Sequence, residues 1–166
     1  MKKRCICLFV ENEVGVLARI SGLFSGKSYN LDSLTVGETE DSTISRMTIS
    51  LTSDDQTFEQ VKKQLNRSVE VIKVIDLTET AIHLKELMFV KITSCSEKDM
   101  NEIFRMAEVF EIKVIDYDAK TVLLESVRTE QRNNDLIAVL QKNYTNRIEI
   151  VRGGGVAMEA VSISER

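Results

Sequence analysis

Residues 5–24 read CICLFVENEVGVLARISGLF and contain the clearest structural signal of the chain. An apolar run (5–10) leads through Asn12-x-x-Gly15 into apolar residues at helical spacing (16–24), so we predict a strand followed by a helix. A helix that begins there directs unpaired N–H groups and partial positive charge outward, which suits a carboxylate, and Gly15 allows close approach to the main chain. On this stretch alone, a small-molecule pocket and a plain turn, in which Asn12 is a turn or cap residue, are equally good interpretations.

The same order of elements occurs twice along the chain. Apolar periods of about 2 and about 3.6 residues alternate in the order βαββαβ. Predicted strands cover residues 3–10, 31–36, 44–51, 69–77, 87–93, 112–117, 121–127 and 147–151. Predicted helices cover residues 16–24, the segment after the capping-box pattern Ser53-x-x-Gln56, the segment from Ser96, and residues 130–143.

We therefore predict an α+β protein made of two ferredoxin-like βαββαβ units. Each unit has an antiparallel four-stranded sheet with two helices on one face, and the domains cover residues 1–78 and 79–166. Both sides of the first strand are apolar, so a second copy, the second domain or another protein is expected to cover its bare face. Gly153-Gly154-Gly155 lacks the Lys-Ser/Thr continuation of a phosphate loop, which favours a flexible connector.

Composition argues against several classes of protein. A net charge of -4 and 5% aromatic residues disfavour nucleic-acid binding, including RNA binding by a sheet of this topology. No apolar segment approaches the roughly 20 residues that span a bilayer, and we expect a cytoplasmic protein. Cys5, Cys7 and Cys95 are interpreted as small core residues, not metal ligands, and His83, the only histidine, lies at the junction. Catalytic residues are therefore not expected in this chain.

Three segments, taken together, are a more specific family signature than Asn12-x-x-Gly15 alone: residues 11–24 (ENEVGVLARISGLF), 29–36 (YNLDSLTV) and 45–49 (SRMTI). They closely resemble the small regulatory subunit of acetolactate synthase (acetohydroxyacid synthase). The likeness is dense over residues 4–77, which resemble an ACT domain, and rests on length and element order over residues 88–151. The resemblance implies a non-catalytic subunit that activates a separate catalytic subunit and lets branched-chain amino acids, chiefly valine, inhibit it. It also implies no cofactor in this chain, with thiamine diphosphate, Mg and FAD in the catalytic subunit.

The resemblance further implies an effector bound between protomers of a homodimer or larger homo-oligomer. The implied effector-binding residues are Asn12, Gly15, Val16, Leu17, Asn30 and Leu31. Main-chain N–H groups at Gly15, Val16 and Leu17 would hold the carboxylate while Asn12 shapes the loop. Asn30 would accept from the ammonium or bridge to the paired protomer, and Leu31 with Val16 or Leu17 would wall the side-chain pocket.

One segment departs from the family, which usually has Gly directly before the residue that corresponds to Tyr29. Ser28 occupies that position here, and a left-handed serine would be strained. A turn shifted onto Gly26 would displace Asn30. Two alternatives remain open: a stand-alone ACT-type amino-acid sensor or transcriptional co-regulator, and a small acyl-phosphate hydrolase, for which the first loop lacks a convincing Arg/Asn pair.

Overall fold

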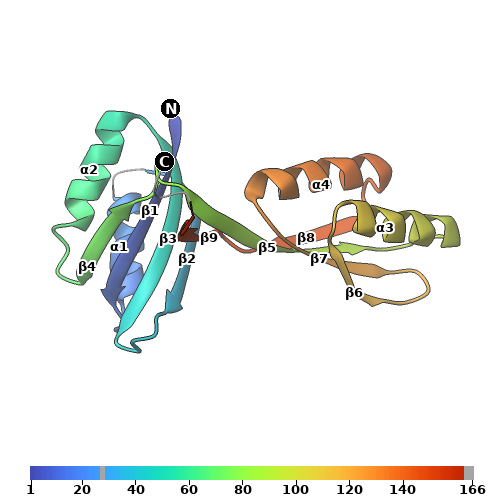
Figure 1. Cartoon of the computed structure of the whole chain (residues 1–166), viewed down its shortest axis with the longest axis horizontal. Helices are drawn as coiled ribbons and strands as arrows, with labels where there is room; N and C mark the ends of the chain where they lie inside the picture. The colour runs from blue at the N-terminus through green and yellow to red at the C-terminus, as the bar shows by residue number, and fades with distance from the viewer. Residues whose placement is uncertain (27–28, 163–166) are drawn as a thin grey trace. The chain divides into compact units, whose positions relative to one another are not determined.

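The computed structural model describes residues 1–26 and 29–162 (Figure 1). The chain forms two compact units, one of Met1–His83 with the tail that starts at Gly154, and one of Leu84–Gly153. The expected domains were residues 1–78 and 79–166, whereas the compact units meet between His83 and Leu84 and the segment from Gly154 belongs to the first unit. In the described part of the chain, no helix is long and apolar enough to cross a membrane.

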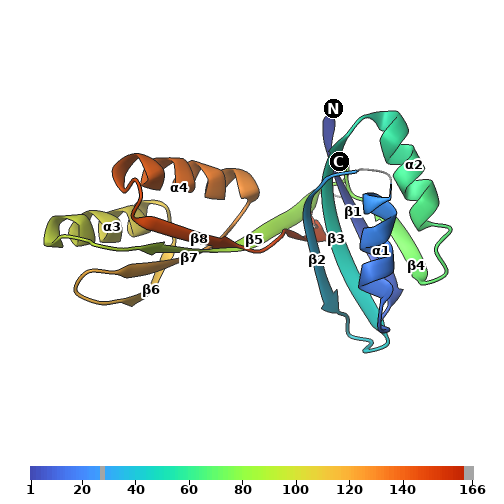
Figure 2. The ribbon, with the colours of Figure 1, turned by 180° about the vertical axis from the view of Figure 1, so that it is seen from behind.

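The first unit has the predicted βαββαβ order. Its elements are β1 (Lys2–Glu11), α1 (Val16–Ser25), β2 (Leu31–Glu38), β3 (Ile44–Ser53), α2 (Asp55–Leu65) and β4 (Val71–Asp76). The sheet is antiparallel with the strand order β2-β3-β1-β4, so β2 and β4 are its edges. Both helices cover one face: α1 lies behind the sheet in Figure 1 and in front of it in Figure 2. This arrangement confirms the ferredoxin-like prediction.

Alternation along the strands places the core of the first unit between the sheet and the helices. Ile6, Leu8 and Val10 of β1 point toward α1 and α2 and are fully buried. They pack with apolar residues at helical spacing on α1 and α2, Ile20, Phe24, Phe58, Val61 and Leu65.

The cap of α2 differs from the predicted one. Asp54 is the N-cap, and its carboxylate accepts the Thr57 N–H at 2.8 Å. Ser53 instead ends β3, where its side chain is buried, so the predicted Ser53-x-x-Gln56 capping box is wrong by one residue. An aspartate caps as well as a serine does, and the register of β3 decides between them.

The second unit repeats the topology. Its elements are β5 (Ile82–Ile92), α3 (Glu97–Val109), β6 (Lys113–Tyr117), β7 (Val122–Arg128), α4 (Glu130–Asn143) and β8 (Ile148–Arg152). The strand order is β6-β7-β5-β8, and α3 and α4 cover one face (Figure 1). The predicted start of α3 at Ser96 is confirmed, because Ser96 and Asp99 form a reciprocal capping box.

The tail after the three glycines is a strand, β9 (Val156–Glu159), which pairs with β5. It also covers the sheet face of the first unit that the helices leave bare. The Thr35 hydroxyl donates to the Gly155 carbonyl at 2.9 Å, and Arg46 Nη2 donates to the Ala157 carbonyl at 2.7 Å. Ala157 is only 1% exposed. The three glycines thus lead into an ordered strand, and the bare face of the first sheet is covered by a segment of the predicted second domain (79–166), which was one of the three covers expected.

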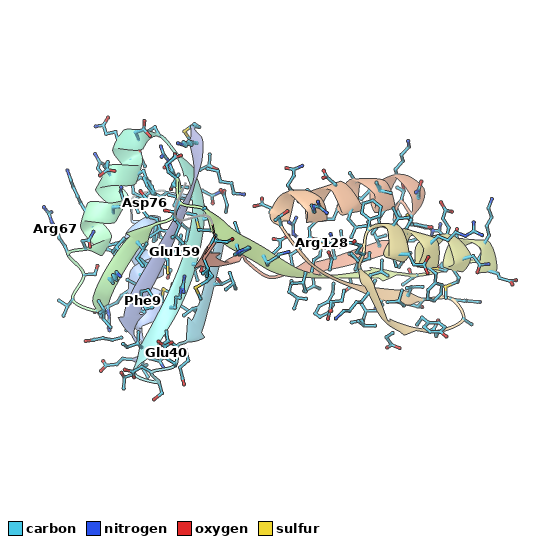
Figure 3. All side chains as sticks on the ribbon, viewed as in Figure 1. Phe9, Glu40, Arg67, Asp76, Arg128 and Glu159 are labelled. Carbon is cyan, nitrogen blue, oxygen red and sulfur yellow. The ribbon has the colours of Figure 1, made fainter. Side chains whose placement is uncertain are left out.

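The thiols of β1 lie beneath this cover. Cys5 and Cys7 are buried, and burial raises the pKa of both thiols. Arg46 Nε donates to Cys7 Sγ at 2.9 Å, and the Arg46 guanidinium lies over the Phe9 ring, 5.4 Å from its centroid. Phe9 on β1 and Glu159 on β9 are labelled in Figure 3. The cysteines therefore act as packed core residues on this face, as the sequence indicated.

We expect Gly154→Ala to loosen the tail. A Cβ at Gly154 would lie 2.7 Å from Thr35 Cγ2 and 3.3 Å from Ser33 Cβ, and overpacking of this kind costs about 1 to 3 kcal/mol. Opening of β9 would expose Cys7, so its reaction with a thiol reagent should accelerate roughly tenfold or more. Gly153→Ala is the matched control, because its nearest contact at 3.6 Å is ordinary. Equal labelling rates in the two variants would contradict this account of the tail.

Tyr144 makes the second unit sensitive to alkaline pH. Its side chain is 1% exposed, and its hydroxyl has no hydrogen-bond partner within the described ranges. Burial, aided by the nearby carboxylates of Glu102 and Asp99, raises the pKa of Tyr144 to about 12. The unfolded chain releases this proton near pH 10 while the folded chain keeps it, so stability falls as pH rises from 10 to 12, by about 2 to 3 kcal/mol from this group.

Tyr144→Phe should remove that part of the alkaline loss. At pH 7 the variant should be as stable as the parent or more so, because a buried hydroxyl without a partner is unfavourable. Denaturant unfolding of both proteins at pH 7, 10 and 12 measures the difference. Parallel stability curves across this range would show that the Tyr144 hydroxyl is solvated in the folded protein.

Candidate functional site

The loop between β1 and α1 ends in a left-handed glycine. Gly15 has φ 87° and ψ -8° and is the N-cap of α1, so no side chain of the N-cap residue pairs with the first N–H groups of the helix. The first turn of α1 carries no acidic residue, and the Val16 N–H makes only a long contact, 3.3 Å, to the Glu13 carbonyl. The positive end of the α1 dipole therefore faces outward without a compensating carboxylate on the helix itself.

The three residues at this helix mouth differ in what they offer. Gly15 presents bare main chain. Val16 is only 2% exposed and its side chain belongs to the core, so the group it offers is its N–H, which makes the long contact to Glu13. Leu17 is 44% exposed, so its side chain, unlike that of Val16, can form part of the wall of a pocket. Their role in holding a carboxylate stays a prediction.

Asn12 fixes the loop and does not face the helix mouth. Its Nδ2 donates to the Ser42 carbonyl at 2.9 Å, its Oδ1 accepts the Ser45 hydroxyl at 2.9 Å, and its N–H donates to the Thr43 carbonyl at 2.8 Å. Nδ2 also lies 3.4 Å from a carboxylate oxygen of Glu38, at the end of β2. The amide of Asn12 is therefore engaged in tying the β1–α1 loop to the β2–β3 loop.

Arg19 is a further residue of this site that the sequence interpretation did not include. Its guanidinium lies next to Gly15, because a Cβ built on Gly15 would be 3.4 Å from Arg19 Nη1. Arg19 Nε forms an ion pair of 2.5 Å with Glu70, with side chains 53% and 20% exposed. The spacing Gly15-x-x-x-Arg19 is the available signal, since residues four apart share one helix face. The site thus combines a helix N-terminus with a cation.

Asn30 and Leu31 lie at the other end of α1. Asn30 is exposed and precedes β2, and Leu31 is half-buried against the core of the first unit. The ten residues of α1 span about 15 Å, so Gly15 and Asn30 of one chain cannot contact the same amino acid. Figure 2 shows α1 running along the sheet, from the end of β1 toward the start of β2.

The turn between α1 and β2 differs from the sequence expectation. Gly26 has φ -64° and ψ -14°, which is right-handed, so the expected shift of a left-handed turn onto Gly26 is wrong. Ser28, where strain was expected, lies outside the described residues. The Tyr29 N–H donates to the Phe24 carbonyl at 3.1 Å, which fixes the start of β2 against the end of α1.

Comparison with known proteins identifies the family that the chain resembles. Residues 6–73 match the family model described as the AHAS small subunit-like ACT domain, and residues 85–161 match the one described as the small subunit of acetolactate synthase. Together the two matches take in most of both compact units.

Individual relatives give the same result. The acetolactate synthase small subunit of Aquifex aeolicus is 40% identical over 166 residues, covering 99% of this chain and 85% of that protein. The isozyme 3 small subunit of Escherichia coli is 35% identical, covering 94% of each chain. The crystal structure of the small subunit from Thermotoga maritima is 30% identical with a TM-score of 0.86, covering 98% of this chain and 100% of that one.

Proposed function

Because the chain belongs to the acetolactate synthase small-subunit family, we propose that it activates a separate thiamine-diphosphate-dependent catalytic subunit and makes that enzyme sensitive to valine. The chain is the regulatory partner and the chemistry belongs to the catalytic subunit, with its thiamine diphosphate, Mg and FAD. The result is feedback control of branched-chain amino-acid synthesis in the cytoplasm.

The observation that supports effector binding most strongly is the pair of features at the two ends of α1. A free amino acid carries a carboxylate and an ammonium a few ångströms apart. Gly15 with Arg19 suits the carboxylate, and the exposed Asn30 suits the ammonium, but they lie about 15 Å apart within one chain. One amino acid contacts both only if they come from two copies.

The edge strand β2 supplies the geometry for two copies. The β1–α1 loop lies at the Glu38 end of β2, as the Asn12–Glu38 contact shows, and Asn30 precedes the opposite end. Antiparallel pairing of β2 with the β2 of a second copy joins the two sheets across an open edge. A two-fold axis then places Asn30 of one copy near Gly15 of the other and creates two equivalent sites.

Regulation follows from differential binding. Valine binds the arrangement in which both halves of its site are in place, and it stabilises that arrangement by the difference in its affinity for the two states, typically about 1 to 3 kcal/mol. The catalytic subunit responds to the arrangement of the paired sheets. The Arg19 side chain is about half exposed, so its ion pair with Glu70 is weak. Arg19 contributes by exchanging part of this ion pair for the effector carboxylate.

The proposal is tested by mixing the purified chain with the catalytic subunit from the same organism and measuring acetolactate formation from pyruvate. We expect the rate to rise on addition of the chain and valine to inhibit only the mixture. A rate that the chain leaves unchanged at saturating concentration would contradict the activating role. The same result together with valine binding would favour a stand-alone amino-acid sensor.

A further inference from the structure

The second unit contains a cavity far along the chain from the Gly15 site. It has a volume of about 450 Å³ and lies between the end of α3, the start of β6, the end of β7 and the first turns of α4. Pockets for small ligands have volumes of roughly 300 to 1,000 Å³. Its apolar wall is formed by Val109, Phe110, Ile112 and Leu136. The cavity is therefore large enough for a small molecule with a bulky apolar part.

The polar side of this cavity carries both signs of charge. Arg128, labelled in Figure 3, and Arg132 supply two cations, and Glu111 and Asp135 supply two anions. The two positive and two negative charges cancel, so the lining does not attract a dianion such as phosphate. The two acidic side chains would repel it. A zwitterion complements it, because the carboxylate can pair with the arginines while the ammonium pairs with the acids.

The arginines are available to a ligand. Arg128 Nη2 donates to the Glu111 carbonyl at 2.8 Å and to Glu111 Oε2 at 2.9 Å, and the Glu111 side chain is 80% exposed. An ion pair with so exposed a partner is weak, so a ligand carboxylate can replace the Glu111 carboxylate on Arg128. Arg132 is exposed and forms no ion pair with any residue that the structure describes.

One residue of the cavity wall, Ser126, belongs to a buried hydrogen-bond network. Ser126, 2% exposed, lines the cavity and donates to Asn133 Oδ1 at 2.7 Å. Asn133, fully buried, donates to Glu86 Oε1 at 2.8 Å, and Arg152 donates to the same oxygen. Glu86 and Arg152 lie within three residues of Leu84 and Gly153, where the unit begins and ends. A ligand that contacts Ser126 therefore touches a network that reaches both ends of the unit.

We propose that this cavity binds a free α-amino acid with a large apolar side chain, such as phenylalanine or leucine. Arg128 and Arg132 hold the carboxylate, Asp135 and Glu111 hold the ammonium, and the side chain lies against Phe110, Ile112 and Leu136. The site is separate from the one at Gly15 and lies within one chain. It gives the second unit a ligand of its own.

The test uses the full chain carrying Gly15→Asp, so that binding at the first site is suppressed. Calorimetric titration with L-phenylalanine and with L-leucine should show one site per chain. Phenethylamine, which lacks the carboxylate, and 3-phenylpropionate, which lacks the ammonium, should each bind at least roughly tenfold more weakly than phenylalanine. Backbone amide signals of Ile112 and Ser126 should shift on addition of phenylalanine in the NMR spectrum of the labelled protein.

Substitutions on α4 decide the location. Arg132→Gln should weaken phenylalanine binding roughly tenfold or more, and Asp135→Asn should weaken it severalfold. Lys142→Gln, an equally exposed change at the other end of α4, should leave it unchanged. Because Arg132 is exposed, its variant should fold normally, which circular dichroism checks. Absence of binding, or binding that Arg132→Gln leaves unchanged, would overturn the proposal whatever the outcome at Gly15.

Discussion

In the Gly15→Asp variant, we expect valine to lose its effect on the holoenzyme while the chain still activates the catalytic subunit. A carboxylate at this helix mouth would occupy the place proposed for the carboxylate of valine. Two like charges about 4 Å apart cost about 4 kcal/mol at an effective dielectric constant of 20, so even with solvent screening the affinity should fall about 100-fold or more. Aspartate tolerates the left-handed φ of Gly15 better than most residues do, which limits the cost to folding.

Gly15→Asn is the matched control for this substitution. Asparagine has nearly the shape of aspartate and also tolerates a positive φ, but it carries no charge. Valine inhibition should weaken less in this variant than in Gly15→Asp, and the difference measures the electrostatic part of the effect. The readouts are the valine concentration for half inhibition and the rate without valine. Normal valine sensitivity in Gly15→Asp would place the effector elsewhere.

The second large effect is expected at the other end of α1. Asn30→Ala removes the side-chain oxygen proposed to accept from the ammonium, and a hydrogen bond to a charged group contributes about 1.5 to 3 kcal/mol. Valine affinity should therefore fall about 10- to 100-fold, although Asn30 lies about 15 Å from Gly15 along α1 of its own chain. Calorimetry with valine measures this.

Asn66→Ala is the control for Asn30→Ala. Asn66 is also an exposed asparagine at a helix end in the first unit, where its side chain donates to the Lys62 carbonyl, and it lies on neither β2 nor α1. Its substitution should leave valine affinity unchanged. Asn30→Ala with unaltered valine affinity would remove this residue from the site and leave the ammonium without its proposed partner.

Periodicity was sufficient to predict the duplicated fold. Alternating apolar residues such as Ile6, Leu8 and Val10 define the face of β1 that meets the helices, and helical spacing on α2 selects Phe58, Val61 and Leu65. These signals are repeated over many residues, so one ambiguous position does not change the result. The cap of α2 depends on a single residue, and there Asp54 competes with Ser53 on equal terms.

The tail could not be predicted in the same way. A strand of four residues gives too short an alternation to distinguish from a loop, and three glycines usually indicate flexibility. Here Gly154 is explained by packing, since Thr35 leaves no room for a Cβ. That contact joins residues 119 positions apart, which no local pattern reports.

The sequence singled out those residues of the candidate site whose features are local, and their roles stay predictions. Gly15 was singled out because its place between a strand pattern and a helix pattern is a local property, and the structure adds that its φ is positive. Arg19 was not included because its proximity to Gly15 depends on the course of its side chain, which turns toward Glu70. Glu70 lies just before β4, so its position depends on the tertiary fold. The family resemblance already implied a site shared by two chains, and the positions of Gly15 and Asn30 at opposite ends of α1 support that proposal.

Mixing two variants that each bind valine weakly decides whether each valine is held by two copies of the chain. Alone, chains with Gly15→Asp should bind valine about 100-fold or more weakly than the parent, and chains with Asn30→Ala about 10- to 100-fold more weakly. A mixed dimer would contain one valine site with both substitutions and one with neither. After unfolding and refolding together, an equal mixture should regain tight valine sites amounting to about a quarter of the parent total, because half of the dimers are mixed. No recovery, with mixed dimers shown to be present, would contradict the account.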